Sequence, residues 1–317
     1  MASLCDSDIS PAARTGSPTG FPDRFVHFTR LNAVPMRPLY GLFVLTFREL
    51  WAKRIVLGLF VISSLLLIGI ALALNLDVVE GSLQGLRVFG EESSGSGPSP
   101  QSPQSMSLTG IVVAVESVVA GAAYWIGILL ALFASAGLFA DLQAAGRAEL
   151  LFSKPVHRVT VLTGHILGVW TAVAALVGYL MGGTWLIMSI KSGVWNARFL
   201  LSIVIIVGMF AVMYAVMMLV NVWSESTALT LIVAYGLIFL SLVLTAGNEL
   251  TPHLGSVGTA VFWGLYHILP NFTEVTGIVT TLAKDQPVYS WYPLISSLLF
   301  GGTAYGLTGY LFMQQDL

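Results

Sequence analysis

The sequence is poor in cysteine and in charge, and both absences restrict its class. A single cysteine, Cys5, excludes an intrachain disulfide and a cysteine-based metal site. Charged residues make up only 9% of the 317 residues, whereas soluble globular domains contain about 25%. No Gly-x-x-x-x-Gly-Lys-Ser/Thr phosphate loop occurs, so the chain is not expected to hydrolyse ATP. Because 56% of its residues are hydrophobic, we predict an integral membrane protein.

Six apolar runs are long enough to cross a bilayer as helices, which takes roughly 20 residues each. We therefore predict an all-α, polytopic membrane protein whose spans lie at about 55–76, 108–140, 159–190, 199–222, 228–246 and 292–313. At ~1.5 Å per residue, the second and third runs are ~50 Å long, beyond the ~30 Å of hydrocarbon. Either these two helices tilt strongly or they project into the cytoplasm.

The distribution of Lys and Arg predicts the orientation. If both termini are cytoplasmic, the inner segments contain ten of these residues and the outer segments contain four. This asymmetry favours an N-in/C-in topology. The segments 77–107 and 247–291 then become external loops, and the first of them ends in a polar, low-complexity linker.

The segments around the spans have simpler interpretations. Residues 1–35 are rich in Ser, Pro, Gly and Asp, and they predict a disordered tail. Residues 37–53 are apolar at helical spacing and fit an interfacial helix, or alternatively the start of the first span. Residues 257–269 are apolar but too short to span, which indicates a re-entrant or interfacial segment ending at Pro270. Aromatic residues around it suit an outer interfacial belt: Trp263, Tyr266, Tyr289, Trp291 and Tyr292.

The segment 141–158 is charged and broken by proline between two apolar runs. Lys154 precedes Pro155, which disfavours helix at Lys154, so a helix through Gly146 should stop near Ser153. Such a short helix, with apolar and charged faces, suits a groove on a partner protein. The alternative is an ordinary cytoplasmic loop whose positive charges only set the orientation.

The region 137–168 resembles the signature of the ABC-2 type transporter permeases. Its sequence is GLFADLQAAGRAELLFSKPVHRVTVLTGHILG. The matching residues are Gly146, Glu149, Leu150, Leu151, Ser153, Lys154, Pro155, Val156, Arg158 and Gly164. It departs from the family at Phe152 and at Asp141, where the family often has Glu. The segments 36–54 and 266–272 and the C-terminal FMQQDL are similar to further parts of the family, so the resemblance covers about residues 36–317.

The resemblance implies the transmembrane permease subunit of an ATP-driven exporter, located in the prokaryotic cytoplasmic (inner) membrane. Two copies, identical or close paralogues, would pair with separate ABC ATPase subunits. ATP and Mg would bind to the ATPase, and this chain would bind no cofactor, metal or nucleic acid and would not be an enzyme. The resemblance assigns ATPase coupling to Gly146, Arg147, Glu149, Leu150, Leu151, Ser153, Lys154, Pro155 and Arg158.

Glu116 lies about eight residues into the second predicted span. An ionisable group inside a membrane is costly and usually faces a cavity or a partner. Glu116 therefore either lines the transport pathway or binds a cation, or it lies near the outer interface because the run is longer than the bilayer. An ATPase-independent carrier or channel, with Glu116 as the coupling group, is one alternative function. A membrane scaffold without transport is the other.

Two small-residue pairs, Gly164–Gly168 and Gly302–Gly306, have the G-x-x-x-G spacing that allows helices to approach closely. The histidines His165, His253 and His267 are too scattered for metal-ligand spacing on one helix, so a structural role is favoured.

Overall fold

The computed structural model describes residues 54–79, 82–88, 91–92, 108–143, 158–247 and 255–314, together with 41 and 44. The chain divides into two units, Met1–Pro35 and Met36–Leu317. All described residues belong to the second unit. The predicted disordered tail and, apart from 41 and 44, the predicted interfacial helix lie outside the described residues.

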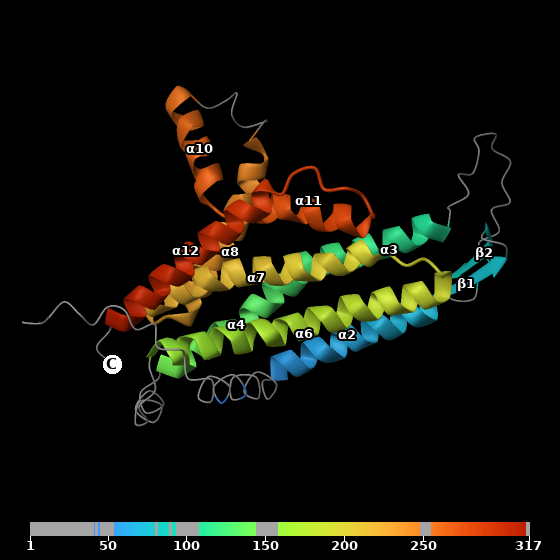
Figure 1. Cartoon of the computed structure of the whole chain (residues 1–317), viewed down its shortest axis with the longest axis horizontal. Coiled ribbons are helices and arrows are strands. Elements are labelled where there is room, and N and C mark those ends of the chain that lie inside the picture. Colours follow the sequence, from blue (N-terminus) through green and yellow to red (C-terminus); the bar gives the residue numbers. More distant parts are fainter. Residues whose placement is uncertain are drawn as a thin grey trace, which may run out of the picture. The chain divides into compact units, whose positions relative to one another are not determined.

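The described residues are mainly helical (Figure 1). In chain order, the helices are α2 (Arg54–Ala73), α3 (Leu108–Ala122), the π-helical turn η1 (Ala123–Gly127), α4 (Ile128–Gln143), α6 (Arg158–Ser192), α7 (Ala197–Ser224), α8 (Thr227–Thr245), α10 (Ser256–Ile268), α11 (Phe272–Ala283) and α12 (Tyr292–Gln314).

Four helical stretches in the described part of the chain are long and apolar enough to cross a membrane. They are Thr109–Leu138, Val159–Ser192, Ala197–Ser224 and Thr227–Thr245. They confirm the second to fifth predicted spans as helices of sufficient length. The first and sixth predicted spans are also helical, as α2 and α12. However, the apolar part of α2, Val56–Leu72, is shorter than the four. Six spans therefore stay a prediction.

Polar residues and turn conformations separate the long helices. After α6, Gly193 has φ +74° and its N–H donates to the Ser189 carbonyl at 2.9 Å. Glycine adopts this left-handed conformation without steric penalty, so it ends the helix. The Asn196 side chain then accepts from the N–H of Phe199 and caps α7. A turn of a few residues thus makes α6 and α7 antiparallel neighbours.

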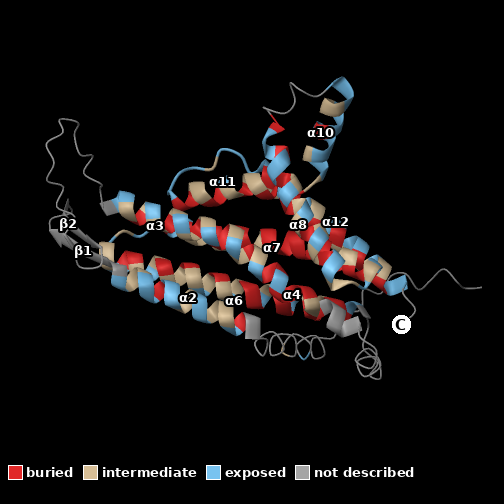
Figure 2. Cartoon of the chain, turned by 180° about the vertical axis from the view of Figure 1, so that it is seen from behind, coloured by how far each residue is buried: buried red, intermediate tan, exposed pale blue. Residues whose placement is uncertain are grey.

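Helix α7 is the central helix of the described part. In the most apolar stretch of α7, 67% of the residues are buried, whereas in that of α8 28% are buried (Figure 2). It contacts α4, α6, α8, α11 and α12. Its buried side chains include large groups such as Phe199, Phe210 and Tyr214. A helix that is apolar all round needs neighbours on every side, which explains this position.

The closest approach of α12 to α7 is at Gly301. A Cβ atom added there would lie 3.1 Å from Cα of Val212 and 2.9 Å from its Cγ2. By contrast, Gly302 and Gly306 are exposed, and an added Cβ would have no atom within 4 Å. Gly302 and Gly306 therefore make no close helix contact among the described residues, and a role of this pair between two copies of the chain stays a prediction.

Two features of the predicted external loops were not anticipated. An antiparallel sheet of β1 (Leu74–Val79), β2 (Ser82–Val88) and β3 (Glu91–Glu92) follows α2 directly. The first predicted span, expected to reach 76, thus ends at Ala73. In the second loop, the predicted segment 257–269 is helical as α10, while its re-entrant or interfacial placement stays a prediction. Helix α11 was not predicted.

Helix α11 is held by neighbours on both sides of its N-terminus. The Oγ of Ser297 on α12 accepts from the N–H of Asn271 at 2.9 Å. The Oγ of Ser241 on α8 accepts from the N–H of Thr273 at 3.0 Å. These bonds satisfy amides that have no intrahelical partner. Together they fix α11 against α7 and α3, where it contributes to the polar site described next.

Candidate functional site

The predicted ATPase-coupling segment is described only at its two ends. Asp141–Gln143 form the last turn of α4, and Arg158 is the first residue of α6. The predicted coupling residues Gly146, Arg147, Glu149, Leu150, Leu151, Ser153, Lys154 and Pro155 lie outside the described residues. Their coupling role stays a prediction, now with a long helix known on each side.

The turn between α7 and α8 lies at the same end of the α6–α7 pair as the start of α6, because the two helices are antiparallel. It consists of Glu225 and Ser226. Glu225 has φ +52°, and Ser226 caps α8 by accepting from the N–H of Leu229. Beside this turn, Trp223 is 80% exposed. This end of the helix pair thus presents a large aromatic surface close to where the segment 144–157 is connected.

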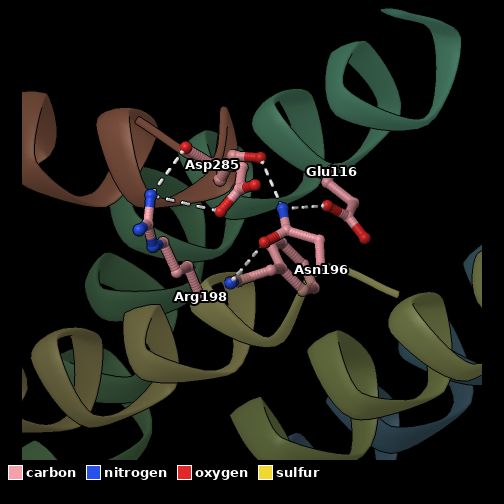
Figure 3. Close-up of polar contacts among 6 residues, drawn as sticks. Glu116, Asn196, Arg198 and Asp285 are labelled. Atoms are coloured by element: carbon pink, nitrogen blue, oxygen red, sulfur yellow. Dashed lines mark hydrogen bonds and ion pairs between the residues drawn. The ribbon is translucent and has the colours of Figure 1, made fainter. Parts of the chain in front are cut away.

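The best-defined polar site lies at the opposite end of α6 and α7 (Figure 3). Asn196 Nδ2 donates to Glu116 Oε2 of α3 at 2.7 Å and to the Ala283 carbonyl of α11 at 2.9 Å. Its Oδ1 accepts from the N–H of Phe199 at 3.3 Å. One side chain therefore joins three helices. We name the contact of Glu116, Asn196 and Ala283 the Glu116 junction.

The carboxyl of Glu116 is enclosed and only half satisfied. Glu116 is 0% exposed and Asn196 is 4% exposed. Oε2 has the bond from Asn196, but Oε1 is buried and has no hydrogen-bond partner in the structure. Glu116 therefore does not contact solvent within a single copy of the chain. Whether it lines a transport pathway stays a prediction.

An exposed ion pair borders the junction. Arg198 Nη1 lies 3.3 Å from Asp285 Oδ1 and donates to the Asp285 carbonyl at 2.8 Å. The two side chains are 51% and 60% exposed. Water screens such pairs, so this one contributes little stability by itself. It does tie the start of α7 to the chain that follows α11, directly beside Asn196 (Figure 3).

Two sets of neutral polar groups are paired elsewhere among the long helices. Tyr214 of α7 is hydrogen-bonded to His165 Nε2 of α6 at 3.0 Å. Trp170 Nε1 donates to the Tyr305 hydroxyl at 3.0 Å, and Tyr305 donates to the Ala211 carbonyl at 2.8 Å. We call these bonds and Gly301 the α6–α7–α12 contact. The hydrogen bond of His165 to Tyr214 agrees with the structural role favoured for this histidine. Separately, the described residues contain no group of three or more His, Cys, Asp or Glu that could hold a metal ion.

The aromatic residues expected at an outer interface lie near α10 and the start of α12. Trp263, Trp291 and Tyr292 are 41%, 44% and 46% exposed, and Tyr289 is 97% exposed. Tyr266 is less exposed, and its hydroxyl donates to Glu274 Oε1 at 2.7 Å. Burial, followed by this bond to a carboxylate, raises the pKa of Tyr266 above its usual value. The belt itself stays a prediction, but its members are available for an interface.

Sequence reasoning found Glu116 but missed Asn196. The available signal was local, because Gly193 and Asn196 interrupt two apolar runs and have the residue types that end one helix and cap the next. The partners of Asn196 could not be predicted, since Glu116 is 80 residues away and Ala283 is 87 residues away in the chain.

No protein-family model matches the chain, and no curated protein matches it. The similarity to the ABC-2 permeases therefore rests on the motif in residues 137–168 and on the flanking segments.

Proposed function

We propose that this chain is the transmembrane permease subunit of an ABC transporter of the ABC-2 type, and that it works as an exporter. Separate ATPase subunits bind and hydrolyse ATP. The segment from Gly146 to Arg158 transmits their movement to the membrane helices. Two copies of the chain, or one copy and a close paralogue, enclose the transport pathway in the prokaryotic inner membrane.

The observation that carries this proposal is the position of the motif between two long helices. The helix through α3, η1 and α4 ends at Gln143, and α6 begins at Arg158 and continues for 35 residues. At ~1.5 Å per residue, α6 is ~50 Å long, so it extends beyond ~30 Å of hydrocarbon. A segment joining two such helices can transmit a push on one side of the membrane to the other side.

The proposed topology has six spans and both termini in the cytoplasm. The four long apolar helices support the second to fifth spans, and α2 and α12 supply the first and the sixth. The segment 144–157, the α7–α8 turn and the end of α12 then face the ATPase. The exposed Trp223 offers a second, smaller contact on that side.

The test is co-purification of an ATPase from native membranes in mild detergent. The double variant Glu149→Arg/Pro155→Ala should reduce the bound ATPase by about tenfold or more, which corresponds to a loss of ~1.4 kcal/mol or more in binding free energy. The matched control is Lys284→Glu/Pro287→Ala, which makes a charge reversal and a proline removal in the exposed turn after α11. This control should retain the ATPase.

Two results would contradict the proposal. The first is that no ATPase co-purifies, even after crosslinking in native membranes. The second is that both double variants release the ATPase equally, because this would indicate general destabilisation. An ion-driven carrier predicts flux that collapses with the ion gradient and needs no ATPase, and a scaffold predicts no flux with any energy source.

A further inference from the structure

The Glu116 junction contains a buried carboxyl whose charge is not compensated by the described residues. Glu116 is 0% exposed, and its Oε1 has no partner. A buried carboxylate is very unfavourable unless a cation or several hydrogen bonds compensate for it. The single bond from the neutral amide of Asn196 is not sufficient. Something else must therefore neutralise this group.

The charged side chains around the junction are committed to other partners or exposed. Lys191 at the end of α6 donates to the Ala71 carbonyl of α2. Arg198 on α7 is paired with Asp285, and Lys284 after α11 is exposed. Among the described residues, no Lys or Arg forms an ion pair with Glu116, and Asp285 adds a second negative charge nearby.

We propose that Glu116 holds a monovalent cation, either a proton or a sodium ion, on its free oxygen Oε1. The bound cation neutralises the carboxyl and stabilises the contact of α3, α7 and α11 through Asn196 (Figure 3). Either ion neutralises the buried carboxylate, a proton by forming an O–H bond at Oε1 and a sodium ion by coordination to this oxygen. This site is separate from the proposed ATPase contact and does not depend on it.

The surroundings of the junction give a cation a short route to Glu116. Asn196 belongs to the turn between α6 and α7, where Trp195 is 62% exposed. On the other side, residues 284–287 after α11 are exposed. The exposed Arg198–Asp285 pair lies beside Asn196 in Figure 3.

The experiment measures the thermal unfolding midpoint of the purified full chain in detergent. In one arm, sodium replaces potassium at constant ionic strength and pH. In the other arm, pH is varied without sodium. A ligand that binds only the folded state stabilises it in proportion to the logarithm of its concentration. Once the cation exceeds its dissociation constant, each tenfold increase should raise the midpoint by about 2 °C.

Glu116→Gln keeps an oxygen that accepts from Asn196 but removes the charge, so it should fold and lose the dependence on the cation. The matched control, Asp285→Asn, removes the exposed carboxylate beside the junction and should keep the dependence. Glu116→Asp provides a second test if the Gln variant does not fold. It keeps the charge on a shorter side chain and should bind the cation about tenfold or more weakly.

The two arms identify the ion. If the unfolding midpoint rises with sodium at constant pH and this rise is lost in Glu116→Gln, the site binds sodium. If the unfolding midpoint rises only when the pH is lowered and this rise is lost in Glu116→Gln, the site binds a proton. The proposal is wrong if the wild type responds to neither ion, or if Glu116→Gln responds like the wild type. Because the measurement uses no ATPase, it can succeed or fail independently of the proposed function.

Discussion

The Glu116 junction and the α6–α7–α12 contact both bury polar groups between long helices, but they do so differently. In the α6–α7–α12 contact, neutral groups are paired within the chain, as Trp170 with Tyr305 and Tyr305 with the Ala211 carbonyl. In the Glu116 junction, an ionisable group has one oxygen without a partner. Neutral pairs can be buried at little net cost, whereas an uncompensated charge cannot. The bonds of the first region are made within the chain, whereas in the second we propose that a bound cation neutralises the carboxyl.

The largest effect is expected at the Glu116 junction from Asn196→Ala. This change removes the donor to Glu116 and to the Ala283 carbonyl, and it also removes the α7 cap. A lost cap costs about 1 kcal/mol, and each buried group left unsatisfied costs about 1–3 kcal/mol. We expect a total loss of at least about 3 kcal/mol in unfolding free energy, measured as a fall in the unfolding midpoint.

Arg198→Ala is the control for this prediction, because it removes only the exposed ion pair and hydrogen bond to Asp285 beside Asn196. Exposed pairs contribute about 0–1 kcal/mol. If the two variants lowered stability equally, the burial of the junction would not be the cause.

A smaller effect is expected where α12 meets α7. Gly301→Ala places a Cβ 3.1 Å from Cα of Val212, so one helix must shift. Overpacking of this kind typically costs about 1–3 kcal/mol. Gly302→Ala, one residue later, meets no atom within 4 Å and should change the unfolding midpoint very little. Equal midpoints for both variants would show that α12 does not pack closely on α7.

The smallest effect is expected from Tyr305→Phe. It removes the acceptor for Trp170 and the donor to the Ala211 carbonyl but keeps the ring. Hydrogen bonds between neutral groups contribute about 0.5–1.5 kcal/mol each. We therefore expect a loss of about 1–2 kcal/mol, with no change in the response to sodium or pH. Tyr310→Phe, at a 55% exposed position, is the control and should be neutral. A changed cation response in Tyr305→Phe would mean that the two regions are not independent.

The sequence by itself determined the membrane class and most of the helix positions. Apolar runs of sufficient length predicted the helices from Thr109 to Thr245, because in hydrocarbon only a helix satisfies every backbone polar group within its own segment. Helix α11 was missed, since 12 residues with several threonines carry no comparable signal. The importance of Glu116 was visible too, because a carboxyl is rare within an apolar run.

Only the tertiary structure decided which side chains meet. Gly301, rather than Gly302 or Gly306, contacts α7, because the rotation of α12 about its axis depends on its neighbours. Likewise, Asn196 meets Glu116 and the Ala283 carbonyl because α3, α7 and α11 pack together. Length and composition are local properties of the chain and can be read from it directly. Contacts between residues about 80 positions apart depend on how the helices pack, and that is a property of the whole fold.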